Sequence, residues 1–165
     1  MDTVKPAGDQ FGDLFNSRLE AGVRAVVVLE AIRPETIDLS EMVLFDHIVV
    51  HTADFSGPPS LHVDVPGRHG ELLVRRQLIE ASLQMMQRCH LVEEIDQEDG
   101  LAWRASDEAA AFVELLETAY SMRLKVCASW LADEVRQRSK AGFKEYVREQ
   151  LGDWGEAFSS YGERR

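Results

Sequence analysis

Two histidines four residues apart, His47 and His51, are the first candidates for chemistry, with Asp54 three residues beyond the second. On a helix this spacing places both imidazoles on one face, where they could hold a zinc ion together with the carboxylate. A hydrolytic zinc site of the HExxH type also needs a glutamate directly after the first histidine, and Ile48 stands there instead. Because apolar residues surround both histidines, we favour partly buried rings, and we expect no bound metal and no cofactor.

Other catalytic signatures are missing from the sequence. It contains no GxxxxGK[ST] phosphate loop, GxGxxG turn, HExxH or GxSxG motif. Cys89 and Cys127 stand far apart without a CxxC pattern, which indicates two thiols packed inside the protein rather than a zinc module or a disulfide framework. We therefore expect a protein that is not an enzyme, and any use of ATP would come from a partner.

Arginines and glutamines gather on the outward face of the helix predicted over residues 71–90. These residue types make bidentate contacts to guanine and adenine in the major groove. Acidic residues follow at once, five of them between Glu93 and Asp99, and they would repel phosphate. We favour a surface that faces a protein or solvent, with DNA recognition as the alternative. The candidate DNA-contacting residues are Arg68, His69, Arg75, Arg76, Gln77, Gln84, Gln87 and Arg88.

The last predicted helix, residues 141–158, carries an apolar stripe with several aromatic side chains. Such a stripe either packs back onto the preceding helix or contacts a second copy of the chain or another protein, because aromatic anchors are common at interfaces. We expect a partner interface here, and the packing alternative stays open. The members of the stripe are Phe143, Tyr146, Val147, Leu151, Trp154 and Phe158.

Length and charge limit the classes of protein to consider. The chain has 165 residues and a formal net charge of −11, from 29 acidic and 18 basic residues. This length suits one compact domain. The longest apolar run, residues 25–29, is far shorter than the roughly 20 residues of a membrane span, and the N-terminal residues lack the pattern of a signal peptide. We expect a cytoplasmic protein without membrane contact, and the acidic charge disfavours a stand-alone nucleic-acid binder.

Hydrophobic periodicity predicts the elements that carry these residues. Pro34 ends the first helix, and Asp38 with Glu41 forms a capping box at the start of the second. Residues 54–70 are rich in proline and glycine and predict a long loop, whereas Asp99-Gly100 predicts the turn of a hairpin over residues 91–105. The predicted helices span residues 15–33, 38–52, 71–90, 107–136 and 141–158.

Three helices, a hairpin and a further helix are the element order of a winged helix-turn-helix domain. We therefore predict a mainly α fold with a small β-hairpin, in which residues 71–90 form the recognition helix and residues 91–105 the wing. The predicted organisation is a flexible N-terminus over residues 1–13, a winged-helix core over 14–106, a helical extension over 107–158 that holds a long helix and the C-terminal amphipathic helix, and a flexible tail over 159–165.

Four stretches of the sequence carry a family resemblance: RLEAGVRA at residues 18–25, FDHIVVH at 45–51, GPPSLH at 57–62 and GELLVRR at 70–76. They resemble the middle component of bacterial ABC-three-component systems, and the likeness covers about residues 14–125. The resemblance implies a small winged-helix adaptor without catalytic residues, encoded between an SMC- or RecN-like ABC ATPase and an effector, in systems proposed to act against phages and plasmids. The implied partners are that ATPase and that effector. A homodimer and a DNA-binding transcriptional regulator acting through helix 71–90 stay open.

Overall fold

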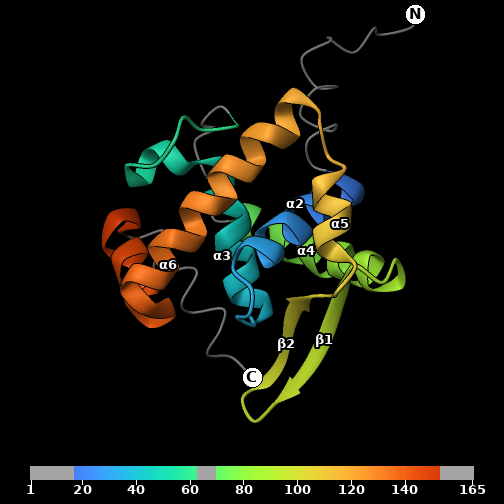
Figure 1. Ribbon diagram of the computed structural model, residues 1–165. Helices are drawn as coiled ribbons and strands as arrows, with labels where there is room; N and C mark the ends of the chain where they lie inside the picture. The colour runs from blue at the N-terminus through green and yellow to red at the C-terminus, as the bar shows by residue number, and fades with distance from the viewer. Residues whose placement is uncertain (1–16, 63–69, 153–165) are drawn as a thin grey trace, which may run out of the picture.

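A computed structural model describes residues 17–62 and 70–152 of the chain. It confirms a mainly helical fold with one two-stranded antiparallel hairpin between helices and a long C-terminal helix (Figure 1). The predicted flexible ends, together with Arg68, His69, Trp154 and Phe158, lie outside the described residues. The elements are α2 (Arg18–Ala31), α3 (Leu39–Val50), the 3-10 helix η1 (Thr52–Phe55), α4 (Gly70–Arg88), β1 (Val92–Gln97), β2 (Gly100–Ala105), α5 (Ala109–Glu114) and α6 (Ala119–Leu151).

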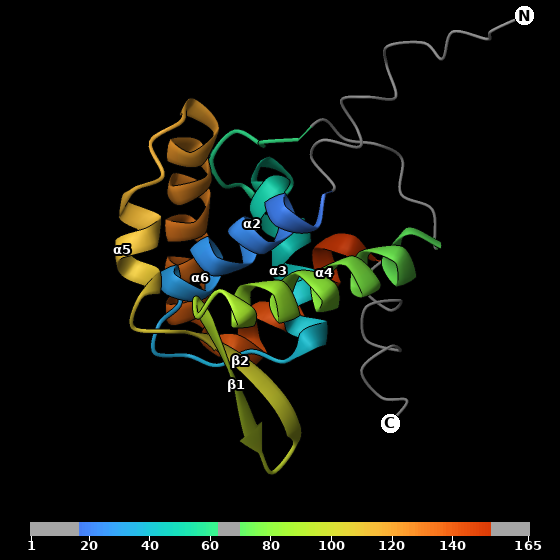
Figure 2. The same cartoon turned by 90° about the vertical axis from the view of Figure 1, so that its right-hand side faces the viewer.

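Helix α3 lies at the centre, between α4 and α6 (Figure 2). Every residue from Glu41 to Val50 is buried, which fits a helix with neighbours on several sides. The predicted capping box is present: the Glu41 backbone N–H donates to Asp38 Oδ1 at 2.8 Å, and the Asp38 N–H donates to Glu41 Oε2 at 2.9 Å. This reciprocal cap fixes the point at which the central helix starts.

The hairpin projects from the helical body and is anchored at its base (Figures 1 and 2). Val92 pairs with Ala105 at that base, and Gly100 follows the turn with a φ of 120°, a value that suits glycine. Ile37, between α2 and α3, exchanges two backbone hydrogen bonds with Trp103, at 3.0 and 2.7 Å. The segment between the first two helices is therefore tied to the hairpin.

The prediction of a single helix over residues 107–136 is wrong in one respect. The chain forms two helices there, α5 and the first part of α6. The Thr118 side chain accepts a hydrogen bond from the Ser121 N–H at 3.1 Å, and this cap starts a new helix although the apolar periodicity continues across the break. Helix α6 runs on past the lapse predicted at residues 137–140, with a kink at Ser139, where φ is 63°. Ser139 Oγ accepts from the Gly142 N–H at 3.1 Å and so caps the part of α6 that follows the kink.

The C-terminal part of α6 packs on the core of the same chain. Phe143 and Val147 are buried, and the Phe143 ring meets Phe45 edge to face with centroids 5.9 Å apart. Lys144 Nζ binds Glu41 Oε1 at 3.0 Å, and Lys140 Nζ lies 3.3 Å from Glu41 Oε2. For Phe143 and Val147, packing within the chain is thus the arrangement observed, and neither side chain is exposed to a partner.

Replacing Phe143 by alanine removes an aromatic ring from the core without a substitute. We expect Phe143→Ala to lower the free energy of unfolding by roughly 3–5 kcal/mol, the usual range for such a truncation, in a urea titration followed by circular dichroism. Glu149→Ala, an exposed change on the same helix, is the control and should stay within about 0.5 kcal/mol of the wild type. Equal stability of the two variants would show that α6 does not complete the core.

Candidate functional site

The outward face of α4 presents glutamines more than arginines. Gln77, Gln84, Gln87 and Arg88 are exposed, as expected for the outward face of this helix. Arg76 instead donates to Ser40 Oγ on α3 at 2.9 Å. Arg75 also turns towards α3. Among the described residues, the basic patch predicted on α4 therefore presents fewer positive charges at the surface than the sequence suggests.

The hairpin next to α4 is acidic at its surface. Glu94, Asp96, Glu98 and Asp99 are exposed, whereas Glu93 forms an ion pair with Arg104 on the opposite strand at 2.7 Å. Four carboxylates on a projecting hairpin create a negative potential that repels a phosphate backbone and attracts positively charged protein surfaces.

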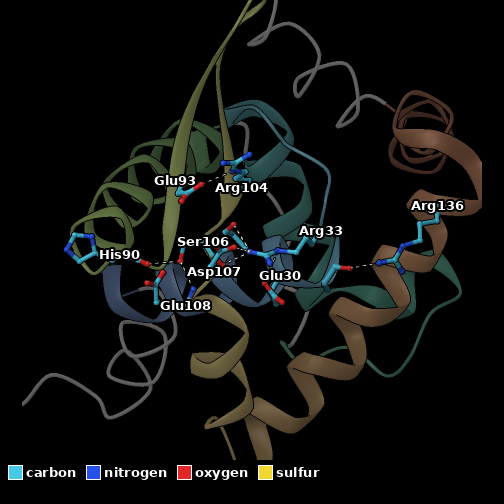
Figure 3. Close-up of polar contacts among 11 residues, drawn as sticks. Glu30, Arg33, His90, Glu93, Arg104, Ser106, Asp107, Glu108 and Arg136 are labelled. Carbon is cyan, nitrogen blue, oxygen red and sulfur yellow. Dashed lines mark hydrogen bonds and ion pairs between the residues drawn. The ribbon is translucent and has the colours of Figure 1, made fainter.

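A polar network fixes the base of this hairpin to the rest of the molecule (Figure 3). The Arg33 guanidinium donates to the carbonyl oxygens of Ala105 and Ser106, at 3.0 and 2.6 Å. Ser106 Oγ donates to the carbonyl of His90 at 2.6 Å, and Arg136 on α6 donates to the carbonyl of Ala31 at 2.7 Å. The end of α2, the hairpin and α6 are therefore held together, and the hairpin carboxylates are presented from a fixed base.

A buried ion pair lies between α2, α3 and α4. The Asp46 carboxylate, with 1% of its side chain exposed, accepts hydrogen bonds from Arg24 Nε at 2.8 Å and from Arg75 Nη1 at 2.8 Å. Burial alone would raise the pKa of Asp46, but the charges of Arg24 and then Arg75 outweigh burial and hold that pKa below its usual value. Burial alone would likewise lower the pKa of Arg24, and Asp46 raises it instead. Arg24 and Asp46 therefore keep their charges.

Three histidines and a tyrosine extend this cluster. The His47 and His51 rings have centroids 4.7 Å apart, His51 meets His62 at 6.4 Å, and His62 Nε2 lies 3.0 Å from the Tyr120 hydroxyl. Burial first, with Arg75 adding to it, lowers the pKa of His47 to about 3. Burial first and Arg24 second lower the pKa of His62 to about 4. Both rings are therefore neutral at neutral pH. The sequence predicted burial for His47 and His51, and each is 8% exposed.

The zinc site considered from the sequence is not assembled. His47 and His51 are buried, but Asp54 points to solvent from η1. Within residues 17–62 and 70–152, no group of three or more histidine, cysteine, aspartate or glutamate side chains is placed to hold a metal ion. Cys127 is buried as predicted, whereas Cys89 is exposed because it follows the last residue of α4, where the chain turns through His90 into β1.

Each of the four stretches that carry the family resemblance contributes to the buried cluster. Arg24 comes from the first stretch, Asp46 and two histidines from the second, His62 from the third and Arg75 from the fourth. Arg75 was predicted from the sequence to contact DNA, and Arg24 and Asp46 were not predicted as site residues. The signal available in the sequence was a charged residue inside an otherwise apolar helix, at AGVRAVVVL and VLFDHIVV.

The family model of the ABC-three component (ABC-3C) system Middle Component 2 matches residues 14–157. The chain belongs to this family. No curated protein and no solved structure matches the chain. The match reaches past the resemblance seen from the sequence, so the middle component includes the part of α6 that carries Phe143 and Val147. Among the described residues, none of the helices combines the length and the apolar composition of a membrane span.

The buried histidines predict how stability depends on pH. An unfolded histidine has a pKa near 6.5, above the folded values of about 3 for His47 and about 4 for His62. Below pH 6.5 the unfolded chain binds protons that the folded chain does not, so the free energy of unfolding falls as pH falls. The contribution of Asp46, whose pKa is lowered, is lost only below about pH 4, where an unfolded aspartate is protonated.

We therefore expect a middle component that loses stability between pH 7 and pH 5 in urea titrations. At pH 5, unfolding of the wild type binds about one proton for each buried neutral histidine, and this number sets the slope of the free energy of unfolding against pH. His47→Gln should therefore lower the number of protons bound on unfolding by close to one. His90→Asn, an exposed position with φ of 60° that asparagine tolerates, is the matched control. An unchanged slope in His47→Gln, or stability that rises towards pH 5, would contradict the buried neutral ring.

Proposed function

We propose that this middle component is a non-enzymatic adaptor that couples an SMC- or RecN-like ABC ATPase to an effector through protein contacts, in a system that acts against phages or plasmids. The family membership supports a place among the other components of such a system. The sequence has no phosphate loop, so the ATPase partner would supply ATP hydrolysis. The adaptor would transmit the state of that partner to the effector.

The observation that carries this proposal is the contrast between the hairpin and α4. The hairpin projects four exposed carboxylates from a base held by Arg33, while Arg75 and Arg76 of α4 bind α3. A DNA-binding surface normally collects lysines and arginines, because neutralised phosphates release counterions. This surface has the opposite charge, and it suits a basic patch on a protein partner.

The element order supports the winged-helix architecture that we propose for this unit. Helices α2, α3 and α4 precede the hairpin, and the Ile37 bridge to Trp103 adds a third extended segment beside it. One departure is the connection between α3 and α4, because residues 51–69 stand where a helix-turn-helix has a turn of three or four residues. In this architecture α4 occupies the recognition position.

A DNA-binding regulator is the second candidate, and one observation favours it. Gln77, Gln84 and Gln87 are exposed on α4, and glutamine side chains can bind adenine edges. With Arg75 and Arg76 bound to α3, we expect DNA affinity to be weak and steeply dependent on salt.

Co-expression with the ABC ATPase and the effector encoded beside the middle component tests the adaptor. We expect one complex that contains all three proteins, measured by size-exclusion chromatography with light scattering. A charge-reversed hairpin, Glu94→Lys with Glu98→Lys, should weaken binding of one component at least tenfold. Asp54→Lys with Glu149→Lys makes the same change in net charge at exposed positions away from the hairpin and is the control.

Two outcomes would contradict this account. A wild-type chain that binds neither component refutes the adaptor, and a charge-reversed hairpin that binds like the control refutes the hairpin as a contact. Fluorescence anisotropy with a DNA duplex at low salt tests the alternative with Arg76→Glu and Arg88→Glu. Tight wild-type binding that both substitutions abolish would favour the DNA-binding regulator, whereas equal binding by all three proteins removes α4 from any DNA contact.

A further inference from the structure

Helix α6 has a second apolar face on the side opposite the core. Leu124, Cys127 and Leu131 are buried on the inner face, as a helix packed on one side requires. On the outer face Met122 is 51% exposed and Val126 is 58% exposed. These fractions are high for large apolar side chains on a helix, and they mark a face that nothing in the described part of the chain covers.

The outer residues recur with the spacing of a helix that pairs with another helix. Ala119, Met122, Val126 and Ser129 are all exposed, and their separations are three, four and three residues. Alternating steps of three and four are the heptad pattern that places knobs on one seam. We name Ala119, Met122 and Val126 the outer stripe.

Basic side chains border the outer stripe on both sides at its centre. Arg123 is exposed, and its guanidinium donates to the carbonyl of Ser60 at 3.1 Å. This hydrogen bond holds the positively charged group on one side of the stripe. Lys125 is half-buried on the other side of the stripe. Two flanking cations stand out in a chain with a net charge of −11. A helix lying along the stripe would meet positive charge on each side.

This charge pattern distinguishes between two occupants. A second copy of the chain, laid along the stripe in either direction, would bring Arg123 and Lys125 against the same two cations of the other copy. Like charges at the edges of a helix pair disfavour that pairing. An apolar helix with aspartates or glutamates at its edges would instead bury Met122 and Val126 and neutralise both cations.

We infer that the outer stripe binds an amphipathic helix with acidic edges, contributed by one of the other two components of the system. This inference rests on the proposed adaptor function and names a surface and a partner chemistry for it. Helix binding of this kind uses apolar anchors at helical spacing, as Met122 and Val126 provide. Figure 1 shows the hairpin and the N-terminal half of α6 at opposite ends of the molecule, so two proteins could bind without competing.

The test uses the full-length chain co-expressed with the ABC ATPase and the effector. Met122→Glu with Val126→Glu places two acids on the stripe at exposed positions of a helix, where glutamate is well tolerated. Gln137→Glu with Gln150→Glu adds the same charge at exposed positions of α6 away from the stripe and is the control. Circular dichroism and thermal unfolding check that both variants stay folded.

We expect the stripe variant to bind one component at least tenfold more weakly while it still binds the other. Lys125→Glu should weaken the same component, with an effect that shrinks as salt is added. If the wild type binds both components and the stripe variant binds them equally well, the inference fails and the adaptor stands. If the wild type binds neither, both fail. A wild-type dimer that the stripe variant turns into a monomer would show a second copy on the stripe and overturn the inference.

Discussion

The buried carboxylate of Asp46 is the constraint on which the arrangement of the first three helices depends. It accepts hydrogen bonds from Arg24 on α2 and from Arg75 on α4, and it belongs to α3. A carboxylate buried in this way is stable only while its partners remain in place, because its desolvation is costly. Arg75 is therefore a structural residue of the middle component, and the position of α4 against α3 follows from it.

The surface of the molecule follows from the same pairing. With Arg75 turned inward and Arg76 bound to Ser40, α4 presents mainly glutamines next to the acidic hairpin. Arg33 and Arg136 then fix the hairpin and α6 to the end of α2 (Figure 3). The result is a molecule with an acidic hairpin at one end and the outer stripe of α6 at the other (Figure 1). An adaptor that holds two proteins needs two such separate surfaces.

Periodicity and turn chemistry predicted most of the fold from the sequence. The capping box at Asp38, the end of α2 near Pro34 and the turn before Gly100 are local signals, and each stands where expected. The break at Thr118 was not predictable, because an apolar periodicity that crosses a cap looks like one helix. The buried cluster was not predictable either, since Asp46 selects Arg75 across a separation of 29 residues. The sequence pattern of an apolar stripe is also the same whether the stripe faces a core or a partner. Phe143 is an example, because it was expected at a partner interface and is buried in the core.

A double-mutant cycle on Asp46 and Arg75 tests the central claim most directly. The free energy of unfolding is measured in urea for the wild type, Asp46→Asn, Arg75→Gln and the double variant. Breaking one partner of a buried ion pair costs roughly 3–5 kcal/mol, so Asp46→Asn should lose an amount of that order. The double variant should lose at least about 1 kcal/mol less than the sum of the single variants, as residues in one network do. Additive losses, or an Asp46→Asn variant within about 0.5 kcal/mol of the wild type, would contradict an arrangement of helices held by this carboxylate.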